Sequence, residues 1–264
     1  MLRYFFIWQA DMAAAGLEPC GMFTPTHLLV TALCLALVAF FVYRSRGMTE
    51  RALDRVTLCI AILTAALECG KIAFNWAHGG LTPNNWLPLT FCSFAIYAYF
   101  MIALGRGRVR QAGLGFAVGG GIVAGLTFLI IPMTSVASYP MLHFQSLYSM
   151  LYHSLMMYVG LAYLINGYAR FDMAGYRRYL LFALPACLLA LAVNLVYGLF
   201  DDFTLCNMMF LVYPYRLSDI VPFIGTVYAA APAVYTLGAM AVYLTVPFFV
   251  PYGMTKLPTL IRRQ

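Results

Sequence analysis

The sequence predicts an all-α membrane protein: a bundle of seven transmembrane helices with its N-terminus outside and its C-terminus in the cytoplasm. Three observations predict this fold. Of the 264 residues, 63% are hydrophobic and only 9% are charged, whereas a soluble domain carries about 25% charged residues. Apolar runs long enough to cross a bilayer recur along the chain. Basic residues gather in alternate connecting segments, the pattern that orients membrane helices.

The first four predicted spans are separated by segments that do not suit a lipid interior. Residues 26–44 are apolar until the charged segment RSRGMTERALDR, and residues 56–77 run to the turn-forming segment HGGLTPNN. Residues 87–105 end at the basic segment GRGRVR, and residues 111–131 end at PMTSVASYPM. Pro and Gly in these segments end helices, and charged residues are costly in lipid.

The last three predicted spans cover residues 145–166, 178–200 and 220–248. NGYARFDMAGYRR separates the first two of them, and DDFTLCNMMFLVYPYRLSD separates the last two. Little sequence remains outside the seven spans. We therefore expect a single transmembrane domain over residues 1–264.

The basic residues give the predicted bundle its orientation. Thirteen fall on one side, and only Arg3 and Arg216 fall on the other. Cytoplasmic loops carry the excess of Lys and Arg, so an odd number of spans places the C-terminal tail inside. Because these residues are scattered between apolar runs, they do not indicate a nucleic-acid partner; membrane lipids are the expected partners. The thirteen are Arg44, Arg46, Arg51, Arg55, Arg106, Arg108, Arg110, Arg170, Arg177, Arg178, Lys256, Arg262 and Arg263.

Polar and ionisable side chains fall near the outer ends of four predicted spans. Such residues are rare in lipid, which makes each a candidate for function. Glu68 and Lys71 are spaced three residues apart and share one helix face, where they can pair. The complete candidate set is Glu68, Lys71, Thr90, Cys92, His143, His153, Asn194 and Asn207.

Cys92 and His153 suggest a chemistry for this region. A thiolate is the reactive form of cysteine, and a nearby imidazole can take its proton. In a bilayer such a thiol would meet the acyl esters of lipids, so acyl transfer or hydrolysis is the expected reaction. Nearby aromatic residues could line a groove for an acyl chain: Phe91, Phe94, Tyr97, Tyr148 and Tyr152. The seven cysteines show no metal-binding spacing and no HExxH motif occurs, so we expect no metal or organic cofactor.

Other interpretations of the same residues remain open at this level. Glu68 and Lys71 could be a structural ion pair, and Cys92 could simply pack, as buried free cysteines commonly do. His153 could bridge helices by a hydrogen bond. The whole chain could then be a transporter or channel-like protein with a polar outer vestibule, or a non-catalytic membrane partner subunit. Activated thiol chemistry would separate the enzyme from these alternatives.

Several segments resemble the YwaF-type integral membrane proteins. LECGKIAFNW and NNWLPLTFCSFAIYAYFM resemble the family's Glu–Lys helix end and the Leu-Pro-Leu-x-x-Cys entry to its next helix. HFQSLYSMLYHSLMMYVGLAYLI resembles its His-bearing fifth helix, and NLVYGLFDDFTLCNMMFLVYP the Asn-containing end of its sixth. The broad family includes an animal transmembrane acyltransferase that remodels phosphatidylethanolamine. The resemblance implies that Cys92 is a nucleophile and His153 its base, and that the chain resides in a bacterial plasma membrane.

Overall fold

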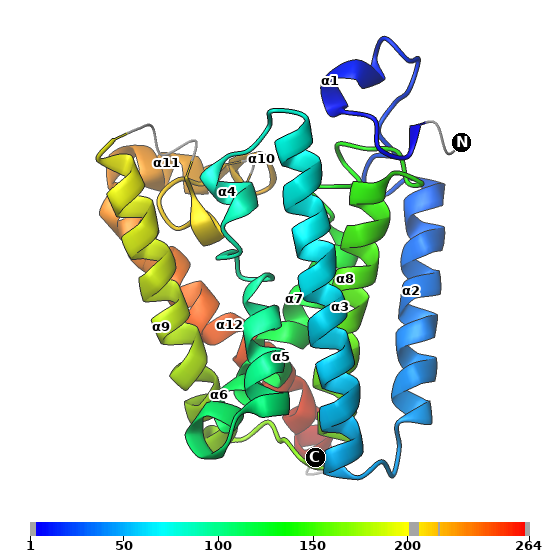
Figure 1. The fold of residues 1–264 in the computed structure, drawn as a ribbon. Helices are drawn as coiled ribbons and strands as arrows, with labels where there is room; N and C mark the ends of the chain where they lie inside the picture. The colour runs from blue at the N-terminus through cyan, green and yellow to red at the C-terminus, as the bar shows by residue number, and fades with distance from the viewer. Residues whose placement is uncertain (1–3, 201–205, 216, 262–264) are drawn as a thin grey trace.

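The computed structural model describes residues 4–200, 206–215 and 217–261. Within these ranges the chain is helical, without β-strands (Figure 1). The elements in chain order are α1 (Gln9–Met12), α2 (Pro25–Arg44), α3 (Glu50–Ala77), α4 (Pro83–Trp86), α5 (Phe94–Leu104), α6 (Gly107–Phe116), the π-helical segment η2 (Ala117–Gly121), α7 (Ile122–Ile130), α8 (Phe144–Ile165), α9 (Met173–Gly198), the 3₁₀ segment η3 (Met208–Phe210), α10 (Leu217–Ile220), α11 (Pro222–Ala230) and α12 (Pro232–Ile261).

Five stretches of the described chain are long and apolar enough to cross a membrane. Two other predicted spans do not reach that standard. α5 is only 11 residues long, and α8 carries polar residues such as Gln145 and His153 among its apolar ones. The five are α2, α3, the continuous stretch Gly107–Ile130, α9 and Pro232–Lys256. Together with the charge-poor composition, they define an integral membrane protein.

Apolar side chains cover the outside of the bundle as well as its core. In α2, only 22% of the most apolar stretch is buried, and Leu29 is 71% exposed. Water would penalise such a surface, whereas lipid does not. The fully buried interior instead contains large side chains such as Tyr99, Tyr152 and Phe116.

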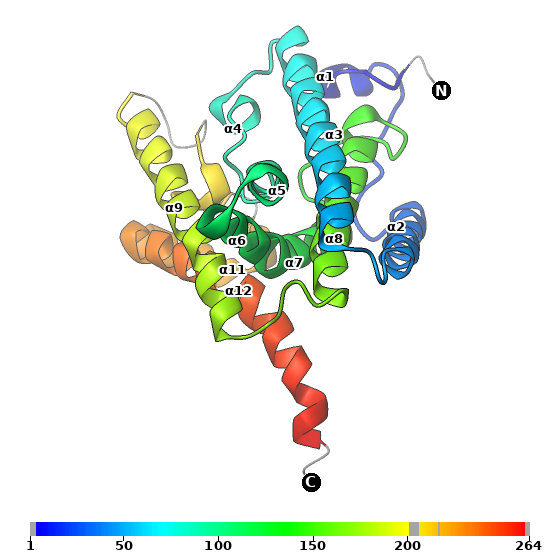
Figure 2. The same cartoon turned by 60° about the horizontal axis from the view of Figure 1, so that its bottom comes forward.

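The basic connections lie at one end of the bundle. The α2–α3, α5–α6 and α8–α9 connections are at the bottom of Figure 1, at the same end as the C-terminus. The N-terminal segment, α4, α10 and α11 lie at the opposite end. Figure 2 shows the last turns of α12 extending away from the bundle at the basic end. The positions of Arg3, Arg216, Arg262 and Arg263 are outside the described residues.

The third predicted span is helical over only part of its length. Residues 87–93 enter as an irregular segment, and α5 begins at Phe94. Pro88 explains part of this, because proline disfavours helical geometry at the residue before it. Leu87 indeed has an extended conformation, with ψ of 116°.

The fourth span starts earlier than predicted and contains a π-helical insertion. The segment GRGRVR was expected to be a loop, but Arg106 precedes α6 and residues 107–110 form its first turn. Arg110 is stabilised there because it binds Glu50 and Asp54 at 2.9 Å each. The glycine-rich sequence Ala117–Gly121 then forms η2, where Gly119 packs against Tyr179 and Phe248.

The seventh predicted span, 220–248, is two helices. α11 ends at Ala230 and α12 starts at Pro232. Proline has no backbone N–H to continue a helix, but it suits the first position of a new one. The intervening Ala231 leaves helical geometry, with φ of −154° and ψ of 81°.

Candidate functional site

A buried ion pair links the candidate residues of α3. Lys71 Nζ lies 2.5 Å from Glu68 Oε1, and the Glu68 side chain is only 4% exposed. Tyr148 of α8 donates a hydrogen bond to Glu68 Oε2 at 2.5 Å. Both carboxylate oxygens are therefore engaged. A buried charge needs such partners, because removing it from water costs several kcal/mol.

Cys92 lies beside this pair, in the turn that leads into α5. Tyr152 of α8 donates a hydrogen bond to the Cys92 carbonyl oxygen at 3.1 Å. The Tyr152 ring centroid lies 5.7 Å from that of Tyr148, the residue that bonds Glu68. The turn is fixed locally, since the Thr90 hydroxyl bonds the Ser93 hydroxyl at 2.8 Å and accepts the Ser93 backbone N–H. Thr90 therefore holds the backbone that presents Cys92.

His153 follows Tyr152 on α8, and its side chain is buried. Its Nδ1 lies 2.7 Å from the Ser149 carbonyl oxygen, and its ring stacks on Phe128 with centroids 3.6 Å apart. A carbonyl oxygen only accepts, so Nδ1 carries the proton. Nε2 therefore has a free lone pair, and it is buried without a hydrogen-bond partner. Within the described chain, no hydrogen bond joins His153 to Cys92.

Asn194 and Asn207 fix the segment that follows α9. Asn194, fully buried, accepts the Met208 backbone N–H at 2.7 Å and donates to the Met208 carbonyl at 3.0 Å. Asn207 donates to the Tyr213 carbonyl at 2.6 Å, and its own backbone N–H reaches the side chain of Asn84 at 2.7 Å. These two asparagines thus make mainly backbone contacts, as loop-fixing residues do.

His143 lies at the N-cap of α8 and holds the N-terminal segment. Its Nδ1 accepts the Gln145 backbone N–H at 3.1 Å, and its Nε2 contacts the Ile7 carbonyl at 2.9 Å. The ring stacks on Tyr139 with centroids 4.2 Å apart. Burial is the main cause that lowers the pKa of His143, with a further contribution from nearby His78. Its contacts are structural and do not involve Cys92.

The structure thus brings together only part of the predicted set. Glu68, Lys71, Thr90 and Cys92 gather around the start of α5, and His153 is adjacent through Tyr152, whose ring centroid is 5.5 Å from that of His153. His143, Asn194 and Asn207 serve other contacts. The sequence did not reveal that Tyr148 and Tyr152 bond Glu68 and the Cys92 backbone. Their four-residue spacing on α8 was the available signal, because it places both on one face.

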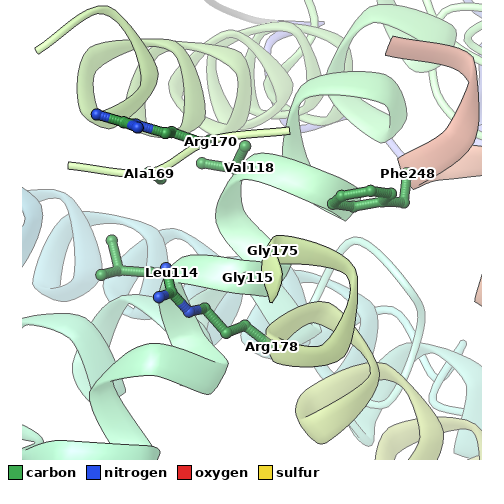
Figure 3. A pocket seen from close by; sticks show the side chains of 8 residues that line it. All are labelled: Leu114, Gly115, Val118, Ala169, Arg170, Gly175, Arg178 and Phe248. Carbon is green, nitrogen blue, oxygen red and sulfur yellow. The ribbon is translucent and has the colours of Figure 1, made fainter. Parts of the chain in front are cut away.

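A small hollow occurs elsewhere, at the basic end. Arg170 and Arg178 flank it, and Phe248 forms part of its apolar wall (Figure 3). Gly115 and Gly175 also line it. None of the candidate residues described above lines this hollow. In the described parts of the chain, no three His, Cys, Asp or Glu side chains are grouped as metal ligands would be.

The fold and the site define a helical integral membrane protein with a buried polar cluster among its helices. A model of the TMEM164 family matches residues 22–248. Because the match covers most of the chain, the protein belongs to the TMEM164 family. None of the curated proteins and none of the solved structures matches it.

Proposed function

We propose that this TMEM164-family protein is a membrane-embedded enzyme that transfers or hydrolyses the acyl groups of lipids. Cys92 is the nucleophile and His153 the base. The observation that carries the proposal is the hydrogen bond from Tyr152 to the Cys92 carbonyl. This bond joins the turn that contains Cys92 to α8, at the residue that directly precedes His153. The same turn lies beside the Glu68–Lys71 pair.

The protonation of His153 supports its role. Because Nδ1 donates to Ser149, the lone pair is on Nε2, as a general base requires. A buried polar nitrogen without a partner is costly in a protein that only needs packing. The same nitrogen can accept a proton when a thiol or a water approaches. Hydrogen bonds between catalytic groups often tighten only when substrate binds.

The resemblance to YwaF-type proteins supports the choice of substrate. Its broad family includes an acyltransferase that acts on phosphatidylethanolamine, and the quoted motifs carry its cysteine and histidine onto Cys92 and His153. Lipid esters reach a site within the bilayer laterally. The proposal leaves the acceptor as a lysolipid alcohol or water.

We also propose that the chain crosses the membrane seven times. α5 with its irregular entry and α8 would then cross together with the five longer stretches, and α11 with α12 would form the last crossing. The basic end would face the cytoplasm, as the charge distribution favours, and the membrane would be a bacterial plasma membrane. Cysteine-reactive labels that do not cross membranes test this sidedness in intact cells. In a chain whose native cysteines are replaced, a cysteine placed at the exposed position of Arg108 should be protected and one at the exposed position of Leu81 labelled; the reverse pattern would refute it.

Acylation of Cys92 is the direct test of the enzymatic proposal. The purified protein is incubated with a detergent-dispersed phospholipid whose acyl chains are isotopically labelled, and Cys92 is examined by mass spectrometry. We expect an acyl group that hydroxylamine removes, because thioesters are labile to it. Cys92→Ser should lose most turnover, since a hydroxyl is a much weaker nucleophile at neutral pH.

Two further variants separate catalysis from packing. His153→Ala should keep the fold and lose acylation, whereas Cys34→Ser on α2 should retain both. If Cys92→Ser remains fully active in the purified system, the proposed mechanism is wrong. A protein that moves solutes without acylating Cys92 would instead support the transporter alternative.

A further inference from the structure

A second buried polar atom has no partner, and it belongs to Tyr99. The Tyr99 side chain has no solvent exposure, and its hydroxyl makes no hydrogen bond. A buried hydroxyl without a partner costs about 1–3 kcal/mol. A phenylalanine would fill the same space without that cost, so packing alone does not account for the tyrosine.

Tyr99 lies close to the reactive turn. Tyr99 is on α5, and Cys92 lies in the turn that leads into this helix, seven residues earlier in the chain. Long side chains on a helix lean toward its N-terminus, and for α5 this is the end where Cys92 lies. Tyr99 and Tyr152 belong to the same buried cluster, and Cys92 packs against that cluster. The free hydroxyl is therefore part of the cluster around the thiol.

The other tyrosines that meet this cluster from α8 have already used their hydroxyl protons. Tyr148 donates to Glu68, and Tyr152 donates to the Cys92 carbonyl. A hydroxyl that has no partner can bind charge that develops on a substrate without first breaking a hydrogen bond. Of these three tyrosines, Tyr99 is the one with its proton available.

We infer that Tyr99 binds the ester carbonyl oxygen of the substrate and stabilises the oxyanion that forms when Cys92 attacks. The inference rests on the function proposed above. Tyr99 then touches a reacting atom, and it is a catalytic residue. The dry surroundings increase its effect, because electrostatic interactions are stronger where water is excluded.

The step balances without any further reactant. His153 takes the thiol proton, and the sulfur pair forms a bond to the ester carbonyl carbon. The carbonyl π pair moves to oxygen, which Tyr99 binds. When this pair returns, the carbon–oxygen bond to the glycerol breaks. The leaving oxygen takes the proton from His153, giving a lysolipid alcohol and an acyl thioester on Cys92.

Tyr99→Phe tests this role in the full-length protein in detergent. We expect the rate of Cys92 acylation by a labelled diacyl phospholipid to fall about 100-fold or more, the typical effect of losing one oxyanion donor. The loss should be in kcat, with KM little changed, because the contact forms mainly in the transition state. The melting temperature should not fall, and iodoacetamide should alkylate Cys92 at the wild-type rate.

Tyr163→Phe is the matched control. Tyr163 is equally buried, but its hydroxyl donates to Asp54 at 2.7 Å. This variant should lose stability and keep its acylation rate. Tyr99→Phe acylation at the wild-type rate overturns the inference, as does a loss that accompanies lower stability or slower alkylation. If wild-type Cys92 is never acylated, the proposed function fails, whereas undiminished acylation in Tyr99→Phe removes only the role of Tyr99.

Discussion

Tyr148 on α8 donates a hydrogen bond of 2.5 Å to Oε2 of Glu68 on α3, while Lys71 occupies the other carboxylate oxygen. This one contact joins two helices that are about 80 residues apart in sequence. It also places a satisfied negative charge beside Cys92. The stability of the site therefore depends on three side chains acting as one unit.

Glu68→Gln should destabilise the protein by about 3 kcal/mol, because Lys71 would keep a charge that has lost its buried partner. Thermal unfolding in detergent measures the change. The double variant Glu68→Leu, Lys71→Met removes both charges and should unfold much closer to wild type. Equal losses in the single and double variants would show that the charge pairing is not what matters.

Tyr148→Phe should cost about 2 kcal/mol, the typical value for a hydrogen bond to a charged group. The ring should still pack against Tyr152, so the effect isolates the hydroxyl. Tyr158→Phe is a suitable comparison on the same helix, since its hydroxyl bonds only the neutral Ser45 at 2.8 Å. A larger loss at Tyr158 than at Tyr148 would contradict the charge-assisted bond.

Docking of the N-terminal segment should weaken in acid. The pKa of His143 is lowered by burial in the folded protein, so the unfolded chain binds its proton first. Stability is then complete above the unfolded pKa of about 6.5 and falls as pH drops through and below it. In the neutral ring, Nδ1 accepts the Gln145 N–H. Protonation places a proton on Nδ1, so this hydrogen bond is lost. The protection of residues 4–23 from hydrogen exchange, relative to the intrinsic rate at each pH, should fall between pH 7 and pH 5.

His143→Asn provides the control for this pH dependence. Asparagine is a good N-cap and can keep the bond to the Gln145 N–H, but it does not titrate. Protection of residues 4–23 from exchange should be lower than in wild type at pH 7 and should change much less with pH. An unchanged pH profile in the variant would assign the effect to another group.

Gly125→Ala should separate α7 from α8. A Cβ at residue 125 would lie 2.6 Å from the carbonyl oxygen of His153, closer than real contacts allow. Overpacking of this kind typically costs about 1–3 kcal/mol, and here it would displace the histidine backbone. The melting temperature and Cys92 acylation should both fall. Gly238→Ala is the matched change, because nothing lies within 4 Å of its Cβ, and it should stabilise α12 slightly.

Arg110→Gln should destabilise the basic end by about 1 kcal/mol, since much of its pairing is partly exposed and screened. The guanidinium joins α6 to α3 through Asp54 and Glu50. Arg108→Gln removes an equal charge from an exposed position of the same helix and should change the melting temperature little. Similar effects of both would indicate that net charge, not the bridge, is responsible.

Much of the helical layout could be predicted from the sequence. Long apolar runs between charged segments have one stable solution in lipid, so α2 and α9 lie where the hydropathy indicates. The interruptions were harder to predict. Breaks at Pro232 and around Pro88 depend on local backbone geometry inside apolar runs, where hydropathy does not distinguish a helix from a short irregular stretch.

For the candidate site, the sequence predicted only the depth of its residues in the membrane. Rarity in lipid drew attention to Glu68, Lys71 and Cys92, and their spacing indicated that Glu68 and Lys71 can pair, as they do in the structure. It did not separate them from Asn194 and Asn207, since an amide that fixes a loop and one that faces a substrate look alike in sequence. The tyrosines were ambiguous for a similar reason: a tyrosine that mainly packs its ring and one that donates its hydroxyl proton look alike in sequence.

The π-helical segment Ala117–Gly121 sets the phase of the helix that contains it. A π turn holds one residue more than an α turn, so the two halves of Gly107–Ile130 are rotated relative to each other about the common axis. The first half presents Gly115 to α9, and the second presents Gly125 to α8. The stretch Gly107–Ile130 thus has two glycine-bearing faces that point in different directions. α9 packs on one of these faces and α8 on the other. Deleting a single glycine from η2 would turn one side away from its neighbour, while both sequences on either side remained intact.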